Sequence, residues 1–409
     1  MNKLIRASFF ILTIFIIISC SNKNSMVGFP GSKIDIYEIT LPDSCFQISY
    51  TWGDSINVFE RNSKLVLGSY DNIESRVLVR FANFPKNPTD IKNVSVSLSI
   101  YKNNLTTDAE YSVHLLSKKW VDNQASWTKY SKSSNWDSNG GDFVSEEIAN
   151  FTINATRADS IGFSIPSSII TQWIEQDTTN FGLIIKEKTR PRNSQFVEFY
   201  STESYSTVLS PILKFDYTND KGKELQYKNR STADIFIHNA EDNLNVTDDV
   251  LSLWNIAPRA IAMKINVPFE LFAEADSSIT SEDDLRLITI NRADLILTKT
   301  EEIFPFTNEK NSVSSYYLTV PLVDQSYFTK ENLLLAHSVV DTLKSNQLFV
   351  NITSPIQAYV SKVKANNGII IKSNYQNMDF SRINFYNINS VDITKRPKVK
   401  IRFSSFRKD

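Results

Sequence analysis

Alternation of apolar and polar residues is the main pattern in this chain, and it predicts antiparallel β-strands. The clearest example is residues 94–100, in which valine, leucine and isoleucine alternate with serine. Residues 213–217 and 399–403 show the same alternation with charged residues between the apolar ones. Such strands bury one face and expose the other. Many short strands without long helices between them predict an all-β fold of jelly-roll-like antiparallel sandwiches.

An internal repeat predicts that this sandwich is duplicated. Gly182 and its neighbours recur around Gly368, Phe199-Tyr200 recurs as Phe385-Tyr386, and Pro211 recurs as Pro397, all at one spacing. A shared spacing over three blocks indicates duplication rather than chance similarity. We therefore predict a first sandwich over residues 34–217, a linker over 218–232 and a second, diverged sandwich over 233–405.

Each copy is expected to carry one short helix. Residues 167–175 place Ile169, Ile170 and Trp173 on one face, and residues 354–360 place Ile356 and Tyr359 in the same way. The second copy also holds extra residues that are absent from the first. They fall within residues 269–289, which carry six acidic side chains and are interpreted as a long acidic surface loop.

The first residues have the pattern of an export signal. Lys3 and Arg6 precede an apolar stretch, which ends at Ile17-Ile18-Ser19-Cys20. This ending resembles a bacterial lipobox, which implies a signal peptide over 1–19, lipid on Cys20 and a polar tether over 20–33. The expected location is then the cell envelope, at the outer membrane, with the lipid as the membrane contact. An ordinary cleaved signal or a terminal anchor stays open as the alternative.

Composition excludes several classes of protein. Lys and Arg number 44 against 45 Asp and Glu, and this even balance gives no basic footprint for nucleic acid. Ten glycines, three histidines and two cysteines argue against phosphate-binding loops and zinc sites. No nucleophile, zinc-protease or nucleotide motif is present in the sequence, so we predict that the protein is not an enzyme.

The first copy contains further motifs. Residues 120–127 begin and end with tryptophan, residues 136–143 read WDSNGGDF, an arginine-flanked strand lies at 76–81, and the copy ends at 211–217. In this order they resemble the DNRLRE-type domain of secreted bacterial proteins, over about Leu65 to Tyr217. The resemblance implies a jelly roll related to carbohydrate-binding modules, some of which bind alginate. The second copy has neither the tryptophan pair nor the Gly-Gly-Asp.

Two sets of residues are candidates for binding a polysaccharide. Trp120, Trp127 and Trp136 are clustered in a loop-rich stretch, and they either form a sugar-stacking platform or pack over one end of the sandwich. The cations Arg76, Arg80 and Lys214 either pair with an acidic glycan or lie on solvated strand faces.

Residues 137–142 are a candidate calcium site. Asp137, Asn139 and Asp142 supply oxygen-bearing side chains beside two glycines, and calcium prefers oxygen ligands at such turns. The alternative is a turn whose side chains bond their own backbone.

The leading hypothesis is a membrane-anchored, non-catalytic lipoprotein that binds polysaccharide, with an acidic glycan as one candidate. The alternative is a structural or assembly component of the envelope that contacts other envelope proteins. Exposed tryptophans favour the first hypothesis, and buried tryptophans favour the second.

Overall fold

The computed structural model describes residues 35–53, 63–70, 73–156, 159–188, 195–240, 250–256, 259–301, 310–322, 332–342, 345–376 and 380–405. The predicted signal peptide, Cys20 and the predicted tether lie outside these ranges, so the lipidation of Cys20 stays a prediction. Within the described ranges, no helix is long and apolar enough to cross a membrane.

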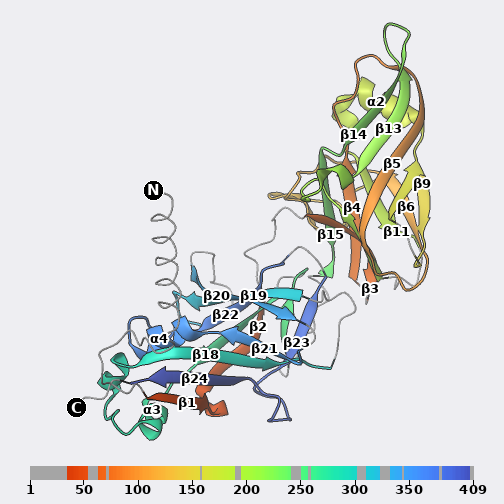
Figure 1. Ribbon diagram of the computed structural model, residues 1–409. Helices are drawn as coiled ribbons and strands as arrows, with labels where there is room; N and C mark the ends of the chain where they lie inside the picture. Colours follow the sequence, from red (N-terminus) through yellow and green to blue (C-terminus); the bar gives the residue numbers. More distant parts are fainter. Residues whose placement is uncertain are drawn as a thin grey trace, which may run out of the picture.

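The first of two antiparallel sandwiches consists of one curled sheet (Figure 1). Its strand order is β14-β13-β5-β12-β3-β4-β11-β6-β9, with β10 beside β5 and β15 beside β4. The strands are β3 (Lys64–Tyr70), β4 (Ile73–Arg80), β5 (Thr89–Asn103), β6 (Ala109–Leu115), β9 (Ala149–Ile153), β10 (Ser160–Ser164), β11 (Leu183–Glu187), β12 (Gln195–Tyr200), β13 (Ile212–Thr218), β14 (Glu224–Arg230) and β15 (Ala233–His238). A short ribbon of β7 (Lys129–Ser131) and β8 (Ser134–Asn135), the helix α2 (Ser167–Glu175) and the turns η2 (Asp177–Thr179) and η3 (Thr207–Leu209) lie in the connections.

The second sandwich has two sheets, with the orders β20-β19-β22-β17-β16-β23 and β1-β24-β18-β21, and β2 lies beside β17. The strands are β1 (Ile36–Leu41), β2 (Phe46–Gly53), β16 (Val250–Trp254), β17 (Arg259–Ile265), β18 (Thr289–Thr298), β19 (Lys310–Leu318), β20 (Leu333–Thr342), β21 (Gln347–Asn351), β22 (Ile369–Ser373), β23 (Arg382–Tyr386) and β24 (Lys398–Ser404). Its helices are α3 (Phe269–Ala275) and α4 (Thr353–Val360), with the turns η1 (Asp43–Cys45) and η5 (Glu282–Arg286). These sheets confirm the predicted all-β class.

The two sandwiches share one pairing scheme. In the first, β11 lies between β4 and β6, and in the second, β22 lies between β17 and β19. Likewise β13 pairs with β5, and β24 pairs with β18. Gly182 and Gly368 stand just before β11 and β22, and both have a positive φ, of 87° and 109°. The strand pairing therefore agrees with the duplication predicted from the repeat.

Each sandwich is completed by a strand pair that lies outside its own repeat. β1 and β2 come first in the chain, yet β1 pairs with β24 and β2 pairs with β17 of the second sandwich. β14 and β15 lie between the two copies and pair with β13 and β4 of the first. Because β24 is equivalent to β13 and β17 is equivalent to β4, the two strand pairs occupy equivalent places. The chain thus crosses from the second sandwich to the first and back again.

This crossing corrects the predicted domain boundaries. Residues 36–53, predicted to open the first sandwich, complete the second one. The predicted linker 218–232 contains β14, and β15, predicted to begin the second sandwich, pairs with β4 of the first. The difference has a physical reason. An alternating pattern identifies a strand and its buried face, but the partner strand is set by tertiary packing.

The predicted acidic loop 269–289 is also corrected. This insertion forms α3 and η5 and buries Phe272, Ile279 and Leu285 against the core of the second sandwich. Its acidic residues Glu270 and Glu282 are exposed. The second copy therefore has two short helices in place of the predicted one, because apolar residues spaced among the acidic ones give the insertion a buried side.

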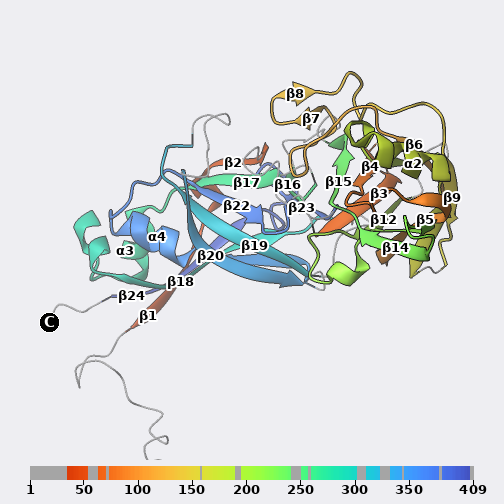
Figure 2. The same cartoon turned by 90° about the horizontal axis from the view of Figure 1, so that it is seen from above.

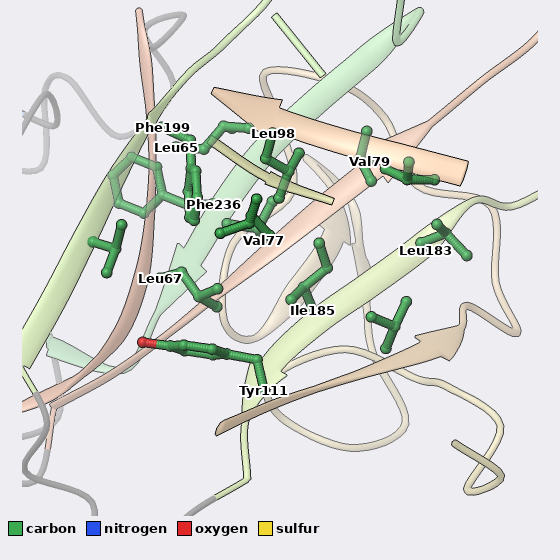
Figure 3. Close-up of a cluster of buried hydrophobic side chains, with 14 of the residues drawn as sticks. Leu65, Leu67, Val77, Val79, Leu98, Tyr111, Leu183, Ile185, Phe199 and Phe236 are labelled. Atoms are coloured by element: carbon green, nitrogen blue, oxygen red, sulfur yellow. The ribbon is translucent and has the colours of Figure 1, made fainter. Parts of the chain in front are cut away.

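Separate apolar cores fill the two sandwiches, and Figure 3 shows part of the first. The α2 residues Ile169, Ile170 and Trp173 are buried in it, as their spacing predicted. A contact between the sandwiches is made by Phe380, whose ring stacks on Phe196 with 3.9 Å between ring centres. The two sandwiches therefore share apolar contacts as well as chain crossings.

The glycine before β11 gives a sharp test of the backbone geometry. Gly182 has φ 87°, and an added Cβ would overlap the carbonyl oxygen of Val79 on β4. We expect Gly182→Ala to lower the free energy of unfolding by about 3 kcal/mol, because strain and overlap add. Gly222 is the matched control, since its φ is 72° but nothing lies within 4 Å of its added Cβ. Gly222→Ala should cost only about 1 kcal/mol in urea unfolding. Equal losses in the two variants would contradict the close approach at Gly182.

Candidate functional site

The tryptophan-rich segment forms a loop that folds over the outer face of the first sandwich. This loop, residues 117–146, connects β6 to β9 and is called the clasp loop below. Figure 2 shows its strands β7 and β8 beside β4 and β15. Under the loop lies a small apolar core, to which β4, β11 and β15 contribute Leu78, Ile184 and Ile237. The clasp loop thus covers a sheet face that would otherwise expose apolar side chains to water.

Two of the three predicted platform tryptophans are buried in this small core. Trp120 is 1% exposed, and its Nε1–H donates to the carbonyl oxygen of Phe181 at 2.9 Å. Trp136 is 5% exposed, and its Nε1–H donates to the carbonyl oxygen of Ser126 at 2.9 Å. Trp127 is half-buried. Because a sugar ring needs an open aromatic face, Trp120 and Trp136 do not provide the predicted platform, and the packing alternative is the one observed for them.

Arg76, predicted to contact an acidic glycan, instead fastens the clasp loop. Its Nε forms an ion pair with Glu74 at 2.7 Å, and its Nη1 donates to the carbonyl oxygen of Gly140 at 2.7 Å. Its guanidinium also lies 4.6 Å from the ring centre of Trp127. A Cβ on Gly140 would meet both Arg76 and Trp127, so the glycine allows the loop to lie this close. The arginine and the Gly-Gly-Asp motif therefore have a structural role here.

The other two predicted cations do not complete a common site. Arg80 lies over the Trp120 ring, with its guanidinium carbon 5.4 Å from the ring centre. Lys214 lies on β13, in register with Ser95 of β5 and Lys228 of β14. Since β13 is not adjacent to β4, the structure brings Arg76 and Arg80 together near the clasp loop and leaves Lys214 on another part of the sheet.

The candidate calcium residues satisfy one another and a lysine. The Lys118 ammonium lies 2.5 Å from Asp137 and 3.1 Å from Asp142. Asp142 also accepts hydrogen bonds from the backbone N–H groups of Asp137 and Ser138, each at 2.8 Å. Asn139 is exposed. Because a lysine already neutralises the two carboxylates and backbone donors fill Asp142, this arrangement does not fit six to eight oxygen ligands around calcium.

The structure instead exposes a group of tyrosines that the sequence analysis did not single out. Tyr101 on β5 is 43% exposed, and Tyr205 in the loop after β12 is 87% exposed. Half-buried Tyr200, at the end of β12, lies between them, with ring-centre distances of 5.4 Å to Tyr101 and 6.4 Å to Tyr205. We call these three residues the tyrosine surface. Lys64 borders it, with its ammonium 4.0 Å from the Tyr101 ring centre.

Tyr101 lies on this surface because β5 continues its alternation. Val94, Val96 and Leu98 are buried and Ile100 packs against the core, so the next residue, Tyr101, faces outward beside Tyr200. The β5–β12 pair also shifts register here: Glu198 lies opposite Lys102 and Phe199 lies opposite Ile100, which leaves Tyr101 without a partner in register. Extending the alternation of residues 94–100 by one residue would have placed Tyr101 on the outward face.

The tyrosine surface is close to charge balance and belongs to the first copy alone. Lys64 forms an ion pair with Glu198 at 2.8 Å, so its charge is neutralised locally. At the repeat spacing, Tyr200 corresponds to Tyr386, but Tyr205 corresponds to Val391. A partial signal for this group was present in the sequence, because Tyr205 lies among polar residues in the stretch 201–206.

Buried Asp234 holds the loop that carries Tyr205. Its carboxylate accepts hydrogen bonds from the backbone N–H of Thr202 at 3.1 Å and from the hydroxyl of Ser231 at 2.7 Å. Burial nevertheless raises the pKa of Asp234 to about 6. At the end of the same strand, β15, burial lowers the pKa of His238 to about 4, and its Nδ1 accepts a hydrogen bond from the backbone N–H of Ala240.

These two groups give opposite pH dependences of stability. Between about pH 4 and pH 6, Asp234 holds a proton in the folded state but not in the unfolded state, because its pKa is raised only on folding. Its contribution to the free energy of unfolding therefore falls as pH rises from about 4 to about 6. The lowered pKa of His238 means that its contribution falls as pH drops from about 6.5 to about 4.

We expect Asp234→Asn to remove the pH dependence caused by Asp234 and to leave that of His238 unchanged. When the pH is lowered from 6 to 4, the free energy of unfolding of this variant, measured with urea, should fall by about 2 kcal/mol more than that of the unsubstituted protein. Parallel pH curves for the two proteins would contradict the buried, protonated Asp234.

Within the described residues, no group of three or more His, Cys, Asp and Glu side chains is placed to hold a metal ion. The tyrosine surface offers exposed aromatic rings with hydroxyl groups and a lysine whose charge is neutralised by Glu198, and it lies on a β-sheet. Chemically, this surface suits a neutral ligand with apolar faces and hydroxyl groups.

Comparison with known proteins adds little to the geometry. No family model matches the chain, and no curated protein matches it. The solved structures with weak similarity include the M60 catalytic domain with the CBM51-1 and CBM51-2 domains from Clostridium perfringens ZmpB. The identity is 9% and the TM-score is 0.14, over 92% of this chain and 42% of that one. This similarity is too low to carry an argument about fold or function.

Proposed function

We propose that this chain is a non-catalytic polysaccharide-binding protein of the cell envelope, whose first sandwich binds glycan on the tyrosine surface. The observation that carries the proposal is the group of three adjacent tyrosine rings, two of them exposed by 43% and 87%, on a rigid sheet. Pyranose rings present apolar C–H faces that pack on aromatic rings, and tyrosine hydroxyl groups add hydrogen bonds. Attachment at the membrane through Cys20 remains part of the proposal.

Charge favours a neutral glycan over an acidic one. Arg76 is engaged by Glu74 and Gly140, and Lys64 is paired with Glu198. A uronate carboxylate would therefore compete with existing partners at both cations. Packing on uncharged rings is not screened by ions, whereas ion pairing is. Binding on the tyrosine surface is therefore expected to persist at high salt.

The test is a panel of neutral and uronic-acid polysaccharides against the chain from Ser21 onward. Tyr101→Ala and Tyr205→Ala should each weaken binding of the best ligand about tenfold, as removal of one aromatic contact worth about 1.4 kcal/mol implies. Tyr375→Ala is the matched control, because Tyr375 is a 38% exposed tyrosine of the second copy. Binding that is unchanged in both first-copy variants would contradict the proposal.

An assembly role is the second candidate. The burial of Trp120 and Trp136 favours it by the criterion stated from the sequence, and exposed apolar side chains favour it independently. Val391 and Ile393, in the loop between β23 and β24, are 97% and 63% exposed. Leu334 and Leu335 on the edge strand β20 are 44% and 61% exposed. Such apolar groups suit contacts with other envelope proteins. If no polysaccharide of the panel binds, this role becomes the better explanation of the molecule.

A further inference from the structure

The first sandwich has a second surface feature with a different geometry, a cleft at the end that carries α2. Figure 1 places α2 at the end of the first sandwich that is remote from the second one. The cleft is about 380 Å³ in volume and is lined by the loop between β4 and β5 and by the C-terminal part of α2. We call it the end cleft. Its volume lies within the range of about 300–1,000 Å³ that is usual for small-molecule sites.

An aromatic wall of the end cleft is anchored in the core. Phe84 and Trp173 both line the cleft, and their rings stack at 6.2 Å between centres. Trp173 is 2% exposed. Phe84 also packs against Tyr227 and Phe215, at 5.7 Å and 6.4 Å. Because these neighbours fix the Phe84 ring from behind, its position in the cleft is set before any ligand arrives.

The loop that carries Phe84 is held in place on both sides. The Tyr227 hydroxyl donates to the carbonyl oxygen of Ala82 at 2.9 Å. The amide of Asn180 donates to the carbonyl oxygen of Phe81 at 2.7 Å. Further along the loop, Asn83 and Asn87 have φ values of 63° and 47°. Asparagine tolerates this left-handed conformation better than most residues, which accounts for asparagine at both positions. The loop thus presents two amide side chains next to the Phe84 ring.

Polar side chains without partners border the end cleft. Asn83, Lys86 and Asn87 lie on the loop side, and Asp177 lies on the side of α2. All four are exposed, and among the residues that the structure describes none of their side chains makes a hydrogen bond or ion pair. The amides and the ammonium offer donors, while the carboxylate and the amide oxygens offer acceptors. Their hydrogen-bonding capacity is therefore available to a ligand.

The equivalent place in the second copy is occupied by protein. Asn83 corresponds to Asn266, and the chain after Asn266 enters α3 at Phe269 in place of a short loop. The insertion that follows reaches the end of α4, where Lys362 forms an ion pair with Glu282 of η5 at 2.8 Å. The first copy lacks this insertion, which leaves the corresponding end of its sandwich open to a ligand.

We infer that the end cleft is a binding site for a single neutral sugar unit, distinct from the tyrosine surface. A simple anion would meet the Asp177 carboxylate, and a simple cation would meet the Lys86 ammonium. A pyranose is uncharged, its hydroxyl groups both donate and accept hydrogen bonds, and its C–H face suits the Phe84 ring. The inference extends the proposed function by giving the first sandwich two sugar sites, but it rests on different residues.

The test uses the chain from Ser21 onward with D-glucose, D-galactose, D-mannose and D-xylose as probes, each at about 50 mM, well above a millimolar Kd. Ligand-observed NMR should show binding of at least one sugar. The double variant Asn87→Gly with Asp177→Ala removes polar groups from both sides of the cleft, and glycine keeps the positive φ at position 87. It should weaken this binding by at least about tenfold. Thr171→Ala, on the exposed side of α2, is the control and should have no effect.

Tyr205→Ala separates this inference from the proposed function. Monosaccharide binding that is lost in the cleft variant and kept in Tyr205→Ala supports the end cleft. Binding that is kept in the cleft variant, or absent for all four sugars, overturns it. If polysaccharide binding still depends on Tyr205 in that case, the tyrosine surface stands and only the end cleft falls.

Discussion

Deleting residues 34–53 is expected to unfold the second sandwich while the first stays folded. The deletion removes β1 and β2, and with them the buried side chains Leu41, Cys45 and Phe46 and the half-buried Tyr37 and Ile39. At about 2 kcal/mol for each large apolar side chain, the loss is on the order of 5–10 kcal/mol, which equals the whole stability of a typical domain. β17 and β24 would also each lose one ladder partner.

Amide hydrogen exchange measures this outcome strand by strand. In the deleted chain, we expect protection to disappear from β17 and β24 and to remain in β5 and β12 of the first sandwich. The control is a chain that begins at residue 34, which should protect all four strands. Adding a peptide of residues 34–53 should restore protection in β17 and β24. Loss of protection in the first sandwich instead would mean that this segment belongs there, as its position in the sequence predicted.

Trp120→Ala should strongly destabilise the first sandwich. The ring is 1% exposed, packs in the small core under the clasp loop and donates a hydrogen bond to Phe181. Removing a large buried aromatic side chain costs about 3–5 kcal/mol. Urea unfolding of the whole chain measures the loss.

Tyr205→Ala is the matched control for that measurement. Its ring is 87% exposed, so its removal should change the free energy of unfolding by no more than about 0.5 kcal/mol. A small loss in Trp120→Ala, comparable with that in Tyr205→Ala, would contradict the structural role assigned to the clasp loop.

Local features of the fold were predictable because they depend on neighbouring residues. The alternation over residues 94–100 identified β5 and its buried face, since side-chain direction in a strand alternates residue by residue. The spacing of Ile169, Ile170 and Trp173 identified the buried face of α2 for the same reason. The recurrence of Gly182 as Gly368 marked a backbone position at which both copies need a positive φ.

Features that depend on distant segments were not predictable from the pattern. The partner of β1 lies more than 350 residues away along the chain, at β24, and nothing in the alternation of β1 specifies it. Burial of Trp120 depends on contacts with distant segments, among them the carbonyl oxygen of Phe181 and the guanidinium of Arg80. The contact of Tyr101 with Tyr200 depends on the pairing of β5 with β12, which neither strand's sequence specifies.

The difference between features set by neighbouring residues and features set by distant segments also explains why the sequence pointed to tryptophans and the structure exposes tyrosines. Clustered tryptophans in a polar segment were compatible with a sugar platform or with packing over the sandwich, and the sequence did not decide between them. In the structure the rings of Trp120 and Trp136 lie under the clasp loop. The exposed aromatic residues are the tyrosines, which come from β5, β12 and the following loop and meet only in the folded sheet.

Hydroxyl-radical footprinting with the best polysaccharide of the panel is the most direct test of the central claim, that the tyrosine surface of the first sandwich binds glycan. The chain from Ser21 onward is labelled with and without the glycan, and the oxidation of each aromatic side chain is compared by mass spectrometry. The expected result is protection of Tyr101 and Tyr205, with unchanged labelling of Tyr375 in the second copy, whose exposure of 38% is close to the 43% of Tyr101. Protection confined to the clasp loop, residues 117–146, or equal protection of Tyr375 would contradict it.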